Sequence, residues 1–182
     1  MKLITEASAE KLRGGFYTPE KIAEFVLRWG INGSTSSDIL EPSCGDGVFL
    51  EQIYKNKFKY KSITAVELDK IEAEKANSIP LKNRQVINSD FHTYCNNTRQ
   101  RFDLVVGNPP YIRYQFFDRK QQVEAEDIFI KAGLTYSKLT NAWVSFVVGS
   151  SLLLKEEGGK IGFVLPAEIL QVSFAQQLRN FI

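Results

Sequence analysis

Between residues 38 and 49 the chain reads DILEPSCGDGVF, a short apolar strand that enters a turn with two glycines and then a helical segment. Val48, Phe49, Ile53 and Tyr54 recur at helical spacing after the turn. The two glycines let the backbone pass close to a ligand without an intervening side chain. An ordinary strand-to-helix turn has the same pattern, so this stretch alone does not define a nucleotide site.

The alternation of strand and helix continues along the chain. We expect strands at Asp38–Leu40, Ser62–Glu67, Gln85–Ile87, Phe102–Val106 and Ile161–Leu165, and helices at Pro19–Trp29, from Val48 onward, at Asp69–Asn77 and at Asn141–Leu154. Thr18 is expected to cap the first helix, with Pro19 at its first position. This pattern predicts a doubly wound α/β fold with a parallel sheet, in which ligands gather at the carboxyl ends of the strands.

Size and composition indicate one globular domain that covers residues 1–182, with 43% hydrophobic and 24% charged residues. The net charge of +2 means that nucleic-acid binding would need a local basic patch. Cys44, Cys95 and the single histidine, His92, cannot form a zinc-binding spacing, and they suggest a reducing, cytoplasmic location. The longest apolar run, Trp143–Leu154, is too short to span a bilayer, so no membrane association is expected.

Polar side chains follow two further predicted strands. Glu67 lies about 20 residues after the glycine turn, a position from which a carboxylate reaches ribose hydroxyls. It could equally be a solvated charge, with Asp69 capping the next helix. Asp90 and Phe91 offer a hydrogen-bond acceptor and an aromatic face to an adenine ring, and core packing is the alternative. We assign His92 to a satisfied or exposed loop position.

The fourth predicted strand ends in Asn108-Pro109-Pro110-Tyr111. Both prolines fix φ and have no N–H, so the turn is stiff. The amide oxygen of Asn108 and the carbonyl oxygen of Pro109 could accept both protons of a planar amino group, which would make its nitrogen nucleophilic. Tyr111 could stack on the same ring. A tight proline turn with no catalytic role is the alternative.

With these motifs in this order, the chain resembles the catalytic domain of the gamma-class S-adenosylmethionine-dependent DNA methyltransferases, which modify the N6 amino group of adenine in restriction-modification systems. The matching segments are Phe16–Pro19, Glu41–Gly47, Glu67, Asp90–Phe91, Asn108–Tyr111 and Ile161–Pro166. The resemblance implies a Rossmann-like, mostly parallel methyltransferase sheet and S-adenosylmethionine as cofactor. No metal is expected, because the sulfonium already activates the methyl group and the protein mainly positions the reactants.

The resemblance also implies roles for individual residues. It places the cofactor on Thr18, Glu41, Gly45, Gly47, Glu67, Asp90, Phe91 and Asn108, and a flipped adenine of double-stranded DNA on Asn108, Pro109, Pro110 and Tyr111. Flipping would cost a few kcal/mol, offset by stacking and by hydrogen bonds to the base. Arg113, Arg119 and Lys120 are candidate phosphate contacts, whereas the lysines of residues 55–61 are expected in a solvated loop.

The chain departs from the family pattern at its C-terminal end. The family's catalytic domain normally continues with two more strands, and a target-recognition domain follows. We therefore expect a catalytic-domain fragment whose sheet is incomplete at the edge formed by Ile161–Leu165, where a protein partner or a second copy could bind. Residues Asp118–Lys138 resemble a variable loop over the site.

Two other functions remain open from the sequence. An Asn-Pro-Pro-Tyr turn suits any amine or amide conjugated to a π system, so the substrate could be an RNA base or a protein glutamine. The Phe16–Pro19 segment favours DNA, because protein-directed relatives tend to lack it. A catalytically silent, cofactor-binding subunit is the alternative from another functional class.

Overall fold

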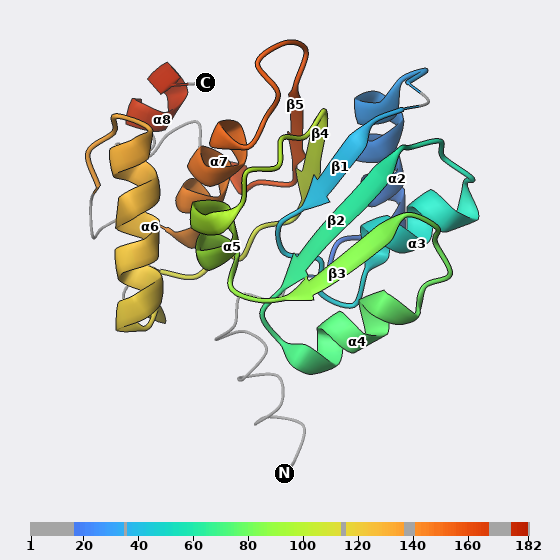
Figure 1. Cartoon of the computed structure of the whole chain (residues 1–182), viewed down its shortest axis with the longest axis horizontal. Helices are drawn as coiled ribbons and strands as arrows, with labels where there is room; N and C mark the ends of the chain where they lie inside the picture. The colour runs from blue at the N-terminus through green and yellow to red at the C-terminus, as the bar shows by residue number, and fades with distance from the viewer. Residues whose placement is uncertain (1–16, 35, 114–115, 137–140, 168–175, 182) are drawn as a thin grey trace.

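The structure, a computed structural model, describes residues 17–34, 36–113, 116–136, 141–167 and 176–181. Strands and helices alternate along the chain, as predicted (Figure 1). In chain order the elements are α2 (Glu20–Ile31), β1 (Asp38–Glu41), α3 (Val48–Lys55), β2 (Ser62–Glu67), α4 (Lys70–Ser78), β3 (Arg84–Asn88), α5 (Phe91–Asn97), β4 (Leu104–Gly107), α6 (Arg119–Lys131), α7 (Ala142–Leu152), β5 (Lys160–Phe163) and α8 (Gln176–Phe181).

The five strands form one sheet in the order β3-β2-β1-β4-β5, and every neighbouring pair is parallel. The strand order reverses between β1 and β4, since β2 and β3 lie on one side of β1 while β4 and β5 lie on the other. A ligand crevice in a doubly wound sheet opens at this reversal point. The predicted parallel α/β architecture is confirmed.

Each face of the sheet is buried under its own helices (Figure 1). Leu40, Val66 and Val105 belong to a core shared with α5, α6 and α7, whereas their strand neighbours pack with α2, α3 and α4. This period-two alternation follows from the pleat of a β-strand, which points successive side chains to opposite faces. Because both faces are covered, most side chains of the central strands are buried, including the polar Thr64 of β2 and Glu41 of β1.

Helix α2 rests directly on the edge strand β5. A Cβ added at Gly162 would lie 2.7 Å from Val26 Cγ1, so only glycine permits this close approach. The helix starts at Glu20, not at Pro19 as predicted, because the ψ of Pro19 is 136°, outside the helical range. Thr18 makes no side-chain cap on this helix, so the predicted capping role is wrong.

Two helices occupy segments that were predicted as loops. Helix α6 fills most of Asp118–Lys138, starting with a capping box in which Asp118 and Gln121 each bond the other's backbone. The described residues end before Ser137 there, so the last part of this range lies outside them. Helix α5 begins directly after Asp90, and it places His92 in the core with 0% exposure instead of in a loop.

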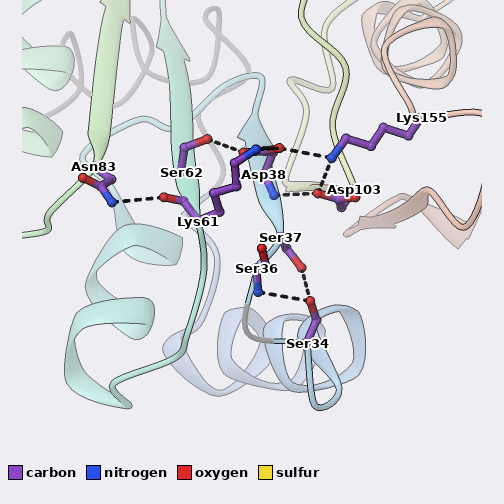
Figure 2. A network of polar contacts seen from close by, with 9 residues as sticks. All are labelled: Ser34, Ser36, Ser37, Asp38, Lys61, Ser62, Asn83, Asp103 and Lys155. Atoms are coloured by element: carbon purple, nitrogen blue, oxygen red, sulfur yellow. Dashed lines mark hydrogen bonds and ion pairs between the residues drawn. The ribbon is translucent and has the colours of Figure 1, made fainter.

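A polar network links the amino ends of β1 and β4 (Figure 2). Lys155 Nζ lies 3.1 Å from Asp38 Oδ2 and 2.8 Å from Asp103 Oδ2. Lys61 Nζ lies 3.0 Å from the same Asp38 oxygen, and Ser62 Oγ donates to its other oxygen at 2.7 Å. The charges of both aspartates are therefore balanced by lysines.

None of the helices in the described residues is long and apolar enough to cross a bilayer. Cys44 and Cys95 are both free and buried.

Candidate active site

A cavity of about 520 Å³ opens at the carboxyl ends of the strands, beside the reversal point. This volume falls within the range of about 300–1,000 Å³ that is usual for small-molecule sites. Of the residues assigned to the cofactor from the sequence, those that line the cavity are Thr18, Glu41, Gly45, Glu67, Asp90, Phe91 and Asn108. The remaining one, Gly47, does not line it.

The two glycines of the turn after β1 have different surroundings. Gly45 has a φ of +53°, and an added Cβ would meet no atom within 4 Å, so its backbone borders open space in the cavity. Gly47 has a φ of +99°, and an added Cβ would lie 2.6 Å from Ile79 Cδ1. Gly47 therefore lets the start of α3 pack against α4, and its requirement for glycine is explained by packing.

Glu41, at the end of β1, is a buried carboxyl group with few hydrogen-bond partners. Its side chain is 2% exposed, and its Oε2 atom has no hydrogen-bond partner. Burial raises its pKa well above the usual value, and the nearby Glu67 and Asp46 carboxylates raise it further. Such a group gains most from a bound cation or a hydrogen-bond donor, so it fits an ammonium group of a ligand.

Glu67, at the end of β2, is held in place by two backbone amides. Gly45 N donates to Oε2 and Asp69 N donates to Oε1, both at 2.8 Å. Burial raises the pKa of this carboxyl group, and the two amides oppose that shift. Because a carboxylate oxygen accepts more than one hydrogen bond, both oxygens retain capacity for ligand hydroxyls. Asp69 also caps α4, as the alternative interpretation proposed, while Glu67 lines the cavity.

Asp90 is fixed from two helices. As the N-cap of α5, its Oδ1 accepts from Thr93 N at 3.1 Å, and its Oδ2 accepts from Gln121 Nε2 of α6 at 3.0 Å. Burial alone would raise the pKa of Asp90, but His92, Gln121 and the Thr93 amide outweigh it and lower the pKa to about 2. Asp90 is therefore an ionised acceptor at the cavity wall.

Phe91 is largely enclosed by protein. It is 2% exposed and stacks on Phe146 of α7 with ring centroids 4.7 Å apart. Both rings line the cavity. Phe91 therefore packs in the core, which was the alternative interpretation. Contact between Phe91 and a purine stays a prediction.

The Asn-Pro-Pro-Tyr turn reaches the same cavity through Asn108 and Pro110, whereas Pro109 and Tyr111 do not line it. The Tyr111 hydroxyl contacts Asn108 Oδ1 and also lies 2.7 Å from the carbonyl oxygen of Val164. Burial raises the pKa of Tyr111 to about 12, so its hydroxyl is a neutral donor. Tyr111 thus orients the Asn108 amide oxygen in this structure, and stacking of its ring on a substrate stays a prediction.

Several cavity residues were not assigned to the site from the sequence. They are Tyr17, Asp46, Leu68, Asp69, Glu72, Ile112, Phe116, Phe117, Gln121 and Phe146, among others. Leu68 is 60% exposed and Phe116 56%, and large apolar side chains left exposed beside a cavity suit a ligand ring. The adjacent aromatic residues Phe116 and Phe117 are a sequence signal that could have identified this wall. Gln121 and Phe146 lie on helices, where only the packing reveals which side chains face the cavity.

The cavity is strongly acidic. Its lining contains Glu41, Asp46, Glu67, Asp69, Glu72 and Asp90, with no lysine or arginine among the lining residues. This charge favours a cationic ligand. S-adenosylmethionine carries a sulfonium and an ammonium group, so the residues present fit it. Within the described residues, no group of three or more His, Cys, Asp or Glu side chains is arranged to hold a metal ion.

The candidate phosphate-binding residues differ in their surroundings. Arg113, Arg119 and Lys120 are exposed at the end of the molecule that carries the Asn-Pro-Pro-Tyr turn and the start of α6. In the 55–61 segment, Lys55 forms exposed ion pairs with Glu20 and Glu51. Residue Phe16 of the N-terminal motif lies outside the described residues, so only Tyr17, Thr18 and Pro19 of that motif are seen.

Comparisons with known proteins agree with this geometry. The model of the Eco57I restriction-modification methylase family matches residues 17–182. The type II methyltransferase M.HincII of Haemophilus influenzae is 30% identical over 169 residues, which cover 93% of this chain and 31% of the relative. The modification methylase CviBIII of Paramecium bursaria Chlorella virus NC1A is 27% identical over 184 residues, which cover 100% of this chain and 45% of the relative. This chain therefore spans less than half the length of these two relatives.

A tRNA1(Val) (adenine(37)-N6)-methyltransferase of Haemophilus influenzae is also similar, with 30% identity over 136 residues that cover 72% of this chain and 54% of the relative. Among solved structures, one from Listeria monocytogenes, described as a class I S-adenosylmethionine-dependent methyltransferase, superposes with a TM-score of 0.70 at 16% identity. It covers 92% of this chain and 51% of that chain. The Rossmann-like methyltransferase fold is thus confirmed, and the family match and the fold support S-adenosylmethionine as cofactor.

Proposed function

Because the chain belongs to the Eco57I restriction-modification methylase family, we propose that it transfers a methyl group from S-adenosylmethionine to the N6 amino group of adenine in DNA. The observation that carries the proposal is the position of Asn108 and Pro110 in the same cavity as Glu41, Glu67 and Asp90. The turn that would hold an amine therefore borders the space that would hold the methyl donor.

The cofactor would lie along the carboxyl ends of the strands. Glu67, with both oxygens preset by backbone amides, would accept the ribose hydroxyls, and Asp90 would accept the purine amine. Glu41 would face the ammonium group, which would supply the partner that its Oε2 lacks. When bound, the cofactor supplies an electrophilic methyl group, so the protein's task is to align a nucleophile with it.

Asn108 would hold the target amine. Its amide oxygen, which the Tyr111 hydroxyl contacts, is a hydrogen-bond acceptor on a residue that lines the cavity, and it would accept an amine proton. This hydrogen bond would draw the nitrogen out of conjugation with its ring and orient its lone pair toward the methyl group. Pro109 fixes the backbone beside Asn108, because its ring restricts φ and offers no competing N–H.

The proposed activity can be tested by methyl transfer from tritiated S-adenosylmethionine to double-stranded DNA, RNA and protein, each assayed in parallel. We expect incorporation into DNA adenine, and we expect Asn108→Ala to lower the rate on the order of 100-fold, as for loss of one preorganised hydrogen bond at a reacting centre. Asn97→Ala is a matched control, because Asn97 lies at the exposed end of α5. Equal rates for Asn108→Ala and the wild type would contradict the proposal.

A second substrate is favoured by one observation, the similarity to a tRNA adenine-N6 methyltransferase over 72% of this chain. The cavity itself suits an adenine from either nucleic acid. Label found in RNA but not in DNA would replace DNA by RNA as the substrate. Label found in protein glutamine would contradict the adenine assignment, and cofactor binding without any transfer would identify a catalytically silent subunit.

A further inference from the structure

His92 is a buried titratable residue to which the proposed mechanism gives no role. It is 0% exposed, yet it belongs to the cavity wall. Its Nδ1 lies 3.3 Å from Asp90 Oδ1, and its Nε2 lies 2.7 Å from Ser145 Oγ of α7. A carboxylate, an imidazole and a hydroxyl therefore lie in sequence from the cavity wall into the core.

The partners determine where the imidazole carries its protons. Asp90 Oδ1 only accepts, so Nδ1 interacts favourably with it as an N–H; the two atoms are at contact distance, without the alignment of a hydrogen bond. Ser145 Oγ can donate its proton either to His92 Nε2 or to the carbonyl oxygen of Ala142, 2.8 Å away. In both cases Nδ1–H faces Asp90.

The surroundings of this imidazole are otherwise apolar. The His92 ring makes edge contacts with Phe117 and Phe146, at centroid distances of 5.3 and 5.1 Å. Of the groups in contact with Asp90, α5 contributes His92 and the Thr93 amide, and α6 contributes the uncharged Gln121. The other acidic cavity residues, Glu41, Asp46, Glu67, Asp69 and Glu72, come from the segments that follow β1 and β2 and from α4. Among the described residues, His92 is therefore the titratable group that contacts Asp90.

We propose that His92 is a positioning residue that keeps the Asp90 carboxylate ionised and oriented, so that the cofactor site selects a purine with an exocyclic amine over one with a carbonyl at that position. The proposal rests on the proposed function, in which Asp90 accepts this amine. His92 holds Oδ1 from the core side and Gln121 holds Oδ2 from α6, so the carboxylate cannot rotate freely. A fixed, ionised carboxylate accepts from an amine and repels a carbonyl oxygen.

Removing the imidazole should make this selection depend on pH. Burial raises the pKa of Asp90 and its hydrogen-bonded neighbours lower it, with the lowering in excess. Without the imidazole, burial would act with less opposition, so the folded-state pKa of Asp90 would move upward. Once protonated, Asp90 could donate to a carbonyl oxygen. The preference for the amine would shrink as pH falls.

The test is calorimetric binding of two probes, S-adenosylhomocysteine and S-inosylhomocysteine, in which a carbonyl replaces the purine amine. For the wild type we expect a preference for the adenosyl probe that changes little between about pH 5 and pH 8, because Asp90 stays ionised. For His92→Phe, which retains an aromatic ring of similar size, we expect this preference to fall about tenfold or more at the acidic end. His92→Asn, which can still donate to Asp90, should restore most of it.

If His92→Phe does not fold, the matched variants Ser145→Ala and Ser150→Ala test the same proposal without changing His92. Both serines are buried in α7, but Ser150 Oγ has no hydrogen-bond partner and does not contact His92. We expect Ser145→Ala to steepen the pH dependence of probe selection, because it frees the imidazole to turn, and Ser150→Ala to match the wild type.

The failure of the inference and the failure of the proposed function give different results. If the wild type binds neither probe, the cofactor assignment and this inference both fall. If the wild type prefers the adenosyl probe while His92→Phe, His92→Asn and Ser145→Ala all show wild-type selection at every pH, only the role of His92 is overturned.

Discussion

The two ends of the same strands use their carboxylates in opposite ways. At the amino ends of β1 and β4, Asp38 and Asp103 share Lys155, and Lys61 adds a second cation to Asp38 (Figure 2). At the carboxyl ends, six acidic residues line a cavity that contains no lysine or arginine. The sharpest contrast is between Asp38, whose charge two lysines balance, and Glu41, whose Oε2 has no hydrogen-bond partner. Asp90 differs from Glu41 because His92, Gln121 and the Thr93 amide lower its pKa to about 2.

This difference is visible in the directions of the pKa shifts. Burial raises the pKa of Asp38, but Ser62, Lys61 and Lys155 outweigh it and lower the pKa to about 2. Burial raises the pKa of Glu41, and neighbouring carboxylates add to that shift. An acid whose pKa is lowered by folding stabilises the folded state, whereas one whose pKa is raised is tolerated at a cost to stability. Glu41 therefore resembles the strained groups found at functional sites.

Among substitutions that compare the carboxyl ends of the strands with their amino ends, the largest expected effect is on cofactor binding. We expect Glu67→Gln to weaken S-adenosylhomocysteine binding by about 10- to 100-fold, because a glutamine replaces one acceptor with a donor that faces a backbone N–H. Asp103→Asn is the control from the opposite end, and its affinity should equal that of the wild type. Calorimetry on both variants checks this, and equal losses of affinity would remove the distinction between the ends.

A second prediction concerns the sign of a stability change. Glu41→Gln should stabilise the cofactor-free protein by about 1–3 kcal/mol at neutral to alkaline pH, because it removes a buried acid that lacks a partner. The pKa of Glu41 is raised on folding, so its unfavourable contribution grows as pH rises from the unfolded-state pKa of about 4.3 toward the folded value. Urea unfolding at several pH values measures this. A lower free energy of unfolding for Glu41→Gln would contradict this prediction and would show that Glu41 supports the fold. In both cases Glu41→Gln should bind the cofactor more weakly than the wild type.

The smallest expected effect lies at the amino ends. Lys155→Ala should destabilise the protein on the order of 1 kcal/mol, since its ion pairs are partly exposed. The pKa of Asp38 is lowered on folding, so its favourable contribution is present above the unfolded-state pKa of about 3.9 and is lost as pH falls toward 2. Urea unfolding between about pH 3 and pH 6 should show a shallower acid loss in Lys155→Ala than in the wild type. An unchanged slope would assign the shift to Lys61 and Ser62 alone.

Much of the fold could be predicted from the sequence because the parallel strands carry a local signal. The strand Ser62–Glu67 has the predicted bounds, and the motifs that follow parallel strands meet at one edge of the sheet. Glu67, Asp90 and Asn108 are therefore predicted to lie together, the resemblance adds Glu41, and all four line the cavity. Helix α6 was not predicted, although Asp118 and Gln121 have the spacing of the capping box that begins it.

The parts that could not be predicted depend on tertiary packing. Gln121 approaches Asp90, and Ser145 approaches His92, only because α5, α6 and α7 pack against one another. Lys155 joins Asp38 and Asp103 from a turn that is remote in sequence from β1. No spacing rule connects these residues, so their side-chain contacts appear only in the structure.

The most direct test of the central claim is a crystal structure of the chain with S-adenosylhomocysteine. We expect the ribose to contact Glu67, the purine amine to contact Asp90, and the sulfur to lie on the side of the cavity that contains Asn108. A ligand bound away from these carboxylates, or a sulfur on the opposite side from Asn108, would contradict it.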